Sequence, residues 1–402
     1  MQKTFFHIDV NSAFLSWTAA EKLRQGETTD LRTIPSIIGG DAATRHGIVL
    51  AKSLPAKKYG IQTAEPIVSA YRKCPNLVSE KPDFTLYRAN SLALMQHLAQ
   101  FCPDIEQVSI DECYMDYTPI SHHYPSATQA AYKIKDSVRD SLGFTVNVGI
   151  SDCKVLAKMA SDFEKPDKVH TLYRNEIQNK MWPLPVSDLY MCGHSSVQVL
   201  YKLGIRTIGE LATADPSIII SHLKSHGQLL YDYANGLDNS DIVTQPERLK
   251  GIGNSTTLKQ DAATRQDALP VLMQLAEQVA TRLRKDNRLA GMVCIEIKYH
   301  DFVSVSHQTI LNAPTDNGRD LYQTACDLFD TLWNGSPIRL LGIRTSKLKD
   351  PDEPYQLSLF DMEKEEKSEK QKRMDKTIDE IKEKFGPSSI VKASLLNKKD
   401  SS

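Results

Sequence analysis

The chain has 402 residues, of which 41% are hydrophobic and 25% are charged, and its net charge at pH 7 is -1. This length predicts two to four domains with substantial cores, and the near-neutral charge does not by itself indicate a nucleic-acid-binding protein. No run of about 18 apolar residues occurs and the start lacks the features of a signal peptide, so we expect a cytoplasmic protein that neither spans a membrane nor is exported.

The seven cysteines are scattered and form no CxxC pair, so we expect reduced thiols rather than a zinc ribbon or a disulfide framework. Basic residues gather in three groups that could hold phosphates locally, although solvated surface charge is the commoner explanation for each group alone. The groups are Arg45, His46, Lys52, Lys57 and Lys58; Arg282, Arg284, Lys285 and Arg288; and Arg339, Arg344, Lys347 and Lys349.

The first 165 residues predict an α+β layer. Apolar and β-branched runs predict strands, and apolar residues at helical spacing predict helices. Strands are expected over 5–10, 34–38, 47–51, 109–117 and 144–150, and helices over 12–24, 91–101, 128–142 and 154–163. Their β-α-β-β-α-β progression is typical of a ferredoxin-like sheet with helices on one face.

Two of these strands carry acidic residues. Asp9 stands near the end of the first strand, and Asp111 and Glu112 lie side by side in the strand over 109–117. A buried carboxylate is costly unless it is paired or binds a metal, and no basic partner is evident nearby. The strands could bring the three acids together, and such a set suits Mg²⁺ or Mn²⁺. The alternative is that each acid is half exposed and meets a surface lysine or arginine.

A helical region is expected over 186–239. A turn at Gly193 and the sequence Leu203-Gly204-Ile205 predict a helix-hairpin-helix, in which exposed backbone amides bind a phosphate without reading bases. Ser195 stands where a second glycine would be expected, and a plain helical bundle is the alternative.

A second compact α+β domain is predicted from about residue 247 to 347, with two β-α-β units. A linker over 350–354 follows, and then the apolar residues of QLSLF (356–360), which are hard to justify unless something covers them. The last predicted helix, rich in Glu and Lys, has one apolar stripe that is expected to dock on the body. The stripe consists of Met374, Ile378, Ile381 and Phe385.

Taken together, these stretches resemble the Y-family translesion DNA polymerases, in their DinB/UmuC branch, and they occur in the order that family uses. The resemblance covers roughly residues 1–347 and the tail motif. The stretches are HIDVNSAF (7–14), AKSLPAKKYGIQTAEP (51–66), SIDECYMD (109–116), VGISDCKVLAKMASDFEKP (148–166), the hairpin around Gly193, RLLGIR (339–344) and QLSLF.

The resemblance implies a multidomain α+β architecture. Its expected parts are a ferredoxin-like palm (1–12 and 80–172), inserted fingers (13–79), a helix-hairpin-helix thumb (173–240), an α+β little finger (247–347), and a flexible tail with a linker, a clamp-binding motif and a helix (348–402).

The resemblance also implies a catalytic site. Asp9, Asp111 and Glu112, with the carbonyl of Val10, would bind two Mg²⁺ ions, Mn²⁺ being possible, for a two-metal nucleotidyl transfer. Phe14, five residues after Asp9, would be a steric gate that excludes the 2'-hydroxyl of a ribonucleotide.

Two lysines would contact the triphosphate of the incoming nucleotide, namely Lys57 and Lys165. Leu54 and Lys57 stand where the family often has Tyr and Arg. Leu54 therefore offers no hydroxyl, and Lys57 keeps the charge of arginine but not its bidentate hydrogen bonding. Cys153 stands where relatives often have Asn, and nothing follows from it.

The resemblance further implies the partners, which are primer–template DNA, a deoxynucleoside triphosphate and the bacterial sliding clamp, for a protein expected to be monomeric. Gly193 and Gly204 in the thumb and Arg344 and Lys347 in the little finger would contact DNA phosphates. The clamp would bind QLSLF by hydrogen bonds and an apolar pocket. The clamp-binding residues would be Gln356, Leu357, Leu359 and Phe360.

The implied function is a DNA-directed DNA polymerase that performs error-prone translesion synthesis in DNA repair. An alternative is a catalytically weak or inactive clamp- and DNA-associated regulator with the same fold; Leu54 and Lys57 leave room for it, whereas the three acids speak against it. A nucleotide cyclase with a similar palm would not need the hairpin, the second α+β domain or the tail motif. Asn11 argues against a phosphohydrolase of the DxD type.

Overall fold

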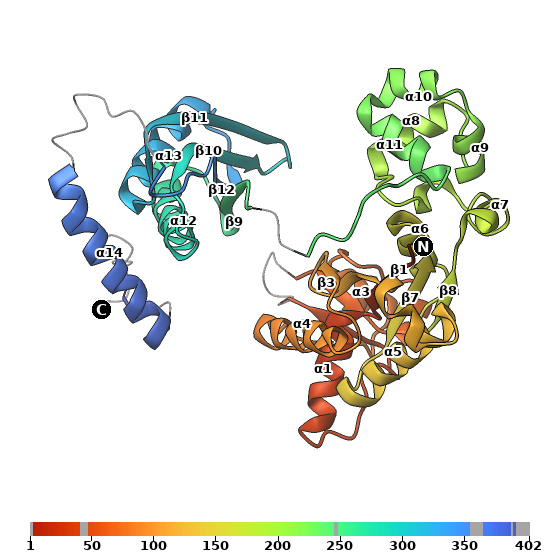
Figure 1. Ribbon diagram of the computed structural model, residues 1–402. Helices are drawn as coiled ribbons and strands as arrows, with labels where there is room; N and C mark the ends of the chain where they lie inside the picture. The colour runs from red at the N-terminus through yellow and green to blue at the C-terminus, as the bar shows by residue number, and fades with distance from the viewer. Residues whose placement is uncertain (1–2, 41–46, 245–247, 354–364, 387–388, 391–402) are drawn as a thin grey trace. The chain divides into compact units, whose positions relative to one another are not determined.

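The computed structural model describes residues 3–40, 47–244, 248–353, 365–386 and 389–390, and it divides into two compact units, Met1–Pro246 and Glu247–Ser402 (Figure 1). The predicted motif at Gln356, Leu357, Leu359 and Phe360 and the basic residues Arg45 and His46 lie outside the described residues. No helix in the described ranges is long and apolar enough to cross a membrane. All seven cysteines are buried free thiols.

Five strands form the central sheet of the first unit, namely β1 (Phe5–Val10), β5 (Ile105–Gln107), β6 (Glu112–Asp116), β7 (Val146–Ser151) and β8 (Val169–Thr171). Their order is β5-β6-β1-β7-β8, and β1 pairs antiparallel with both β6 and β7. All six residues of β1 are buried. The predicted α+β sheet is therefore present, with the first acidic strand at its centre.

Helices cover both faces of this sheet. Ile8 and its neighbours pack with residues of α1 (Ala13–Arg24), α4 (Phe84–Ala99) and α5 (Ala127–Leu142) on one face. On the other face α6 (Lys154–Ser161) approaches so closely that a Cβ atom on Gly149 of β7 would lie 2.0 Å from the Ala157 carbonyl oxygen. The expectation that all helices lie on one face is wrong, because glycine lets α6 pack directly on the strand.

The second acidic strand is shorter than predicted. It begins only at Glu112, because the N–H groups of Val108 and Ser109 both donate to the carbonyl of Glu112, at 3.1 and 3.3 Å, and close a hairpin with β5. Asp111 therefore lies in the turn and not on the strand face opposite Glu112.

A small second sheet and a helical region complete the first unit. The sheet, in the order β3-β2-β4, consists of β2 (Ser36–Gly39), β3 (Val49–Lys52) and β4 (Val78–Glu80), next to α2 (Leu54–Lys58) and α3 (Ile67–Lys73). The helical region consists of α7 (Ile177–Lys180), α8 (His194–Lys202), α9 (Ile208–Thr213), α10 (Pro216–Leu223) and α11 (Ser225–Ala234). Short 3-10 helices lie at Thr118–His123 (η1), Arg174–Glu176 (η2) and Val186–Asp188 (η3).

The helical region shares its core with α6. Leu156 and Met159 of α6 are buried together with Leu200 of α8 and Leu211 of α9. Helix α6 therefore covers the sheet face that carries Asp9 and Glu112 and also packs in the core of the helical region.

The second unit is the predicted α+β domain. Its strands are β9 (Gly251–Ala262), β10 (Ala290–Tyr299), β11 (Ser304–Thr315) and β12 (Ile338–Ser346), in the order β11-β10-β12-β9. The helices α12 (Arg265–Lys285) and α13 (Gly318–Leu332) bury one face of the sheet (Figure 1). The opposite face carries small and polar side chains.

The last helix, α14 (Glu365–Phe385), docks by charge rather than by its apolar stripe. Arg284 of α12 donates to both oxygens of Asp379, at 2.6 and 3.1 Å, whereas Met374 is 50% and Phe385 67% exposed. Two of the four residues of the predicted stripe are thus exposed, whereas Ile378 and Ile381 are partly buried.

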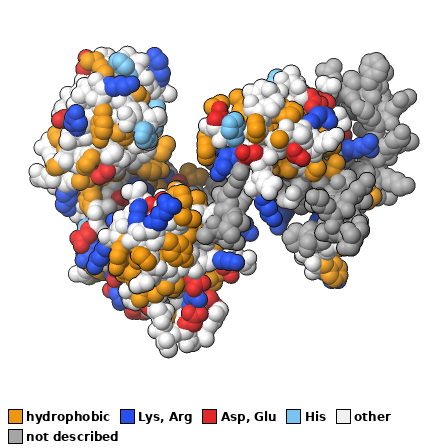
Figure 2. Space-filling model, turned by 180° about the vertical axis from the view of Figure 1, so that it is seen from behind, with side chains coloured by type: hydrophobic (Ala, Val, Ile, Leu, Met, Phe, Trp, Pro, Cys, Tyr) orange, Lys and Arg blue, Asp and Glu red, His pale blue; other side chains and the backbone are white. Residues whose placement is uncertain are grey.

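The same ion pairs correct the expectation for the basic group at 282–288. Arg284 is held by Asp379, Arg288 lies 2.5 Å from Asp350, and Arg282 donates to the carbonyl of Gly253. Three of its four residues are thus engaged within the unit. Over the surfaces drawn in Figure 2 basic and acidic side chains are interspersed, so phosphate binding would depend on individual residues.

Replacing Gly149 with Ala should loosen the packing of α6. The added Cβ would lie 2.0 Å from the oxygen of Ala157 and 2.4 Å from the nitrogen of Ser161, both backbone atoms that can move only with the helix. We expect the free energy of unfolding in urea to fall by about 1 to 3 kcal/mol. Gly193→Ala is the matched control, because nothing lies within 4 Å of its added Cβ; equal losses in the two variants would contradict this account of the packing.

Candidate active site

Strand register brings two of the three predicted acids together. Asp9 of β1 and Glu112 of β6 are direct partners in the antiparallel pair, so their side chains lie on the same face of the sheet. Asp111 joins them from the turn, where its carbonyl accepts a hydrogen bond from the N–H of Val10 at 3.0 Å. Residues more than 100 positions apart in the chain thus meet at one end of the sheet.

The same face carries basic groups that the sequence interpretation did not expect. The ammonium of Lys165 forms an ion pair with Asp9 and lies 2.8 Å from Asp162, and the ammonium of Lys158 in α6 lies 2.8 Å from Glu112. The statement that no basic partner lies near the acids is therefore wrong. Two ammonium groups neutralise Asp9 and Glu112 in this conformation.

His7 is a further partner of Glu112. Its Nε2 lies 3.3 Å from a carboxylate oxygen of Glu112, and its Nδ1 lies 2.8 Å from the hydroxyl of Ser161. Burial lowers the pKa of His7, so the ring is neutral near pH 7 and Glu112 faces a neutral group rather than a cation.

The three carboxylates differ in their electrostatic environment. The contact with His7 and the nearby Lys158 ammonium lower the pKa of Glu112 to about 2. Burial, together with the charges of Asp9 and Glu112, raises the pKa of Asp111, whose side chain accepts a hydrogen bond from Ser109 at 2.7 Å. Asp111 is thus a half-buried anion whose acidic neighbours disfavour its charge.

This donor set suits a hard divalent cation chemically. Three carboxylates at one end of the sheet are oxygen ligands of the kind that Mg²⁺ and Mn²⁺ prefer, and added positive charge would relieve the repulsion on Asp111. In the conformation described, ammonium groups face Asp9 and Glu112 instead, and among the described residues no group of three His, Cys, Asp or Glu side chains is arranged to hold an ion.

Phe14 lies in an aromatic cluster at the start of α1. Its ring stacks on Tyr87 of α4, with 4.5 Å between centroids and 12° between planes, and also contacts Trp17 and Phe84. The side chain remains partly exposed. A rigid backing with one accessible surface is compatible with the predicted gate.

The predicted finger residues lie on α2. Leu54 and Lys57 are both exposed there, and the helix is capped by Ser53, whose hydroxyl accepts the N–H of Ala56. Burial lowers the pKa of Lys52, and the charge of the nearby Lys57 lowers it further. The pair forms a small positive site beside the hairpin of β2 and β3.

The predicted hairpin glycines occupy two ends of α8. Gly193 is the N-cap residue of α8 and follows the 3-10 helix η3, and Gly204, with φ +81°, lies in the loop before α9. The helix has no side-chain cap, so its first N–H groups are directed outward. The first helix of the expected hairpin is thus a single 3-10 turn.

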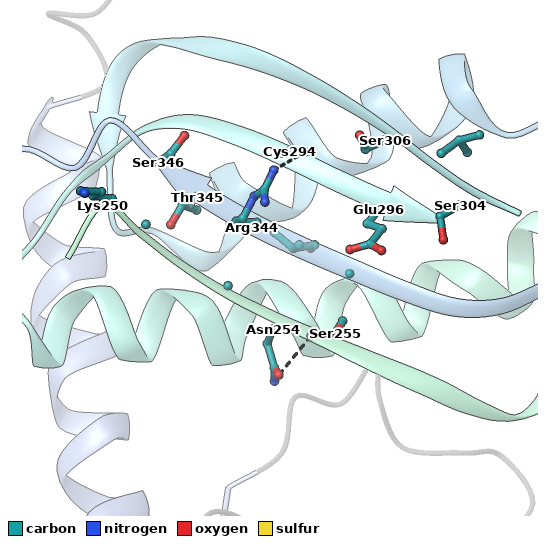
Figure 3. A pocket seen from close by; sticks show the side chains of 15 residues that line it. Lys250, Asn254, Ser255, Cys294, Glu296, Ser304, Ser306, Arg344, Thr345 and Ser346 are labelled. Carbon is teal, nitrogen blue, oxygen red and sulfur yellow. Dashed lines mark hydrogen bonds between the residues drawn. The ribbon is translucent and has the colours of Figure 1, made fainter. Parts of the chain in front are cut away.

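Arg344 lies on the open face of the second unit, in a groove of about 850 Å³. It is opposite Cys294 and Gly253 on the neighbouring strands, and its guanidinium lies 3.9 Å from the sulfur of Cys294 (Figure 3). Lys347 follows the end of β12 and is exposed. Because glycines and serines line much of the groove, a ligand there would meet the sheet backbone.

Three residues that matter for this geometry were missed by sequence reasoning, namely His7, Lys158 and Asn147. His7 could have been found, because residues i and i+2 of a strand share a face and it precedes Asp9 by two. Lys158 and Asn147 face the acids only through the placement of α6 and β7, for which no local signal exists.

Comparison with known proteins identifies relatives of the whole chain. The model of the impB/mucB/samB family matches residues 8–162, and the model of its C-terminal domain matches residues 249–359, so together they cover more than half of the chain. A protein of Clostridium acetobutylicum named DNA polymerase IV is 46% identical over 400 residues, covering 100% of each chain. A Bacillus velezensis protein of the same name is 34% identical, covering 99% of this chain and 94% of the relative.

Among solved structures, a Y-family DNA polymerase chimera is similar with a TM-score of 0.75. The match covers 86% of this chain and 99% of the other, at 20% identity. It supports the multidomain α+β fold.

Replacing Glu112 with Gln should destabilise the fold most at neutral pH. The pKa of Glu112 in the fold is about 2, against an ordinary value of 4.5. A lowered pKa stabilises the fold above pH 4.5, and this contribution is lost as the pH falls toward 2. We expect Glu112→Gln to reduce the free energy of unfolding in urea by about 1 to 3 kcal/mol at neutral pH and by much less near pH 2.

Asp111→Asn should change the free energy of unfolding in the opposite direction. Because burial and the neighbouring acids raise the pKa of Asp111, its charge is unfavourable in the fold above that pKa. We expect this variant to be more stable than the parent at neutral pH, by about 1 kcal/mol, and the advantage to vanish in acid. A loss of stability at neutral pH would show that the carboxylate is not strained by its neighbours.

Proposed function

This chain belongs to the impB/mucB/samB family, and from this membership we infer that it is a Y-family DNA-directed DNA polymerase that performs translesion synthesis. The observation that carries its chemistry is the direct pairing of Asp9 with Glu112, with Asp111 beside them. An acid cluster at the end of a buried sheet is what nucleotidyl transfer at a primer end requires of a protein.

We propose that Asp9, Asp111, Glu112 and the carbonyl of Val10 hold two Mg²⁺ ions, Mn²⁺ being an alternative. Bound divalent ions would make the primer 3'-hydroxyl nucleophilic and neutralise the leaving pyrophosphate. The residues themselves orient the site: His7 fixes the Glu112 carboxylate through a contact of 3.3 Å, and Ser109 fixes Asp111 through one of 2.7 Å. Both contacts reduce the reorganisation needed when substrate binds.

The two lysines would leave their carboxylate partners when substrate and metal bind. Lys165 pairs with Asp9, and Lys158 pairs with Glu112, so each ammonium supplies the positive charge that the carboxylates need. With Asp9 holding a divalent cation, the Lys165 ammonium would be free to contact the triphosphate of the incoming nucleotide. Lys57 on α2 is the proposed second contact to that triphosphate, and its ammonium would act as a point charge without the bidentate hydrogen bonding of an arginine.

Phe14 is the proposed steric gate. Its ring is held by stacking on Tyr87 and cannot retreat without disturbing the buried Trp17 and Tyr87. A fixed ring would reject a 2'-hydroxyl by overlap, whereas a deoxyribose would fit.

DNA would be held by both units. We propose that the backbone amides near Gly193 and Gly204 contact phosphates in the thumb, and that Arg344 and Lys347 contact phosphates from the open sheet of the little finger. The groove of about 850 Å³ that Arg344 lines supports this proposal, because it opens on the sheet face that the helices leave uncovered. None of these contacts depends on the base sequence.

Further proposals come from the resemblance. The palm would comprise residues 1–12 and 80–172, the fingers 13–79, the thumb 173–240 and the little finger 247–347. QLSLF would bind the sliding clamp through Gln356, Leu357, Leu359 and Phe360. We propose that the enzyme acts in the cytoplasm as a monomer recruited by the clamp.

Asp111→Ala should abolish primer extension. Removing one ligand of the proposed metal site leaves charge at the reacting phosphate uncompensated, and we expect the rate of nucleotide incorporation to fall by about 1000-fold or more. The assay uses purified protein, a primed template and Mg²⁺, with and without a template lesion. Asp116→Ala is the control, since Asp116 lies at the far end of β6, the strand that follows Asp111, and its carboxylate caps the turn at Thr118. Unchanged extension by Asp111→Ala would exclude the site.

Arg344→Ala should weaken DNA binding in a salt-dependent way. Loss of one phosphate contact is expected to reduce the slope of log affinity against log salt concentration by about 0.9, equally for all sequences. Binding of a fluorescent primer–template at several salt concentrations measures this slope. Arg265→Ala is the control, because Arg265 is paired with Asp330 on the helices that cover the other face. If both variants showed the same slope, Arg344 would not be a phosphate contact.

A further inference from the structure

Two amide side chains lie beneath the segment that carries Lys165. Asn11 follows β1, and Asn147 in β7 is the direct strand partner of Asp9. Asn147 is completely buried and Asn11 is 7% exposed. The side-chain amide of Asn11 donates to the side-chain oxygen of Asn147 at 3.0 Å, so the two act as one unit.

This pair binds the backbone on both sides of Lys165. Before it, the Asn147 amide donates to the carbonyls of Ser161 at 3.1 Å and of Glu164 at 2.6 Å. After it, the N–H of Asp167 donates to Asn11 at 2.9 Å, and the N–H of Lys168 donates to Asn147 at 3.1 Å. Four backbone groups within eight residues are thus fixed by two side chains.

All hydrogen-bonding positions of Asn147 and most of those of Asn11 are used, which makes the network rigid. Both donors and both acceptor positions of Asn147 are used, and the oxygen of Asn11 accepts a second hydrogen bond from the hydroxyl of Thr145 at 2.9 Å. Buried amides with all partners present specify one conformation, because any shift leaves a polar group unsatisfied. The strand that presents Asp9 and the segment that presents Lys165 therefore share one support.

We propose that Asn11 and Asn147 are positioning residues that fix the backbone of the segment carrying Lys165, so that its ammonium can reach the triphosphate of the incoming nucleotide, and that they thereby set the affinity for that triphosphate. This inference rests on the proposed role of Lys165 in nucleotide binding. A residue displaced by about 1 Å can lose much of its effect on a bound substrate, so loosening the segment should act through Lys165.

A double-mutant cycle tests the proposal. For dNTP incorporation on a primed template we expect Asn147→Ala to raise KM about tenfold with little change in kcat, and Lys165→Ala to raise KM at least as much. The double variant should be no worse than Lys165→Ala alone, because both changes remove the same contact. Effects that multiply, or a fall in kcat without a change in KM, would overturn it.

Asn90→Ala is the matched control, since Asn90 is also buried in the first unit but donates only to the carbonyl of Leu86 in its own helix. It should leave KM unchanged even if the melting temperature falls. Should Asn147→Ala not fold, Asn11→Ala replaces it in the same cycle, because it removes only one bond to the segment.

A second readout does not depend on polymerase activity. Acetylation of individual lysines by acetic anhydride, followed by mass spectrometry, reports how well each ammonium is held. We expect Lys165 to react several-fold faster in Asn147→Ala than in the parent, with Lys158 unchanged. Equal Lys165 reactivity in the two proteins would overturn the positioning role, whereas absence of incorporation by the parent would overturn the proposed function alone.

Discussion

The antiparallel pairing of β1 with β6 is the constraint on which the site depends. Its register sets Asp9 opposite Glu112, and the pairing of β1 with β7 sets Asp9 opposite Asn147. A slip by one residue would turn Glu112 to the other face of the sheet. Such a slip is prevented because alternate residues of β1, including Phe6 and Ile8, are buried in the main core. The packing of the core therefore selects the arrangement of the acids.

Electrostatic balance explains why this arrangement is tolerated. Three carboxylates so close together repel one another, and Lys158 and Lys165 offset the repulsion at Glu112 and Asp9. Asp111 has only the hydroxyl of Ser109 as a side-chain partner among the described contacts, and burial and its neighbours raise its pKa. The fold thus holds a charge that is unfavourable for stability, as is common at functional sites, where stability is lost for activity.

Local signals predicted most of the fold, and non-local contacts account for the differences. The helix ending at Leu142 was predictable because Ser126 caps it and Gly143 ends it with φ +80°. The helix expected from residue 91 begins at Phe84 because the Asp83 side chain accepts two N–H groups, a cap that was overlooked. The family, the α+β fold and the polymerase activity are confirmed by the relatives, whereas the individual site roles stay predictions. Pairing of the acids with Lys158 and Lys165 depends on the packing of α6 and was not predictable locally.

The ion pair between α14 and α12 also bears on the rate at which DNA finds the protein. Arg284 is bound to Asp379 and Arg288 to Asp350, so the charges of these two arginines are offset by carboxylates of the same unit. Arg344 and Lys347 are exposed at the sheet side. If Arg344 and Lys347 contact DNA as proposed, their charges are not offset in this way within the described residues and would draw a polyanion toward the sheet side of the unit.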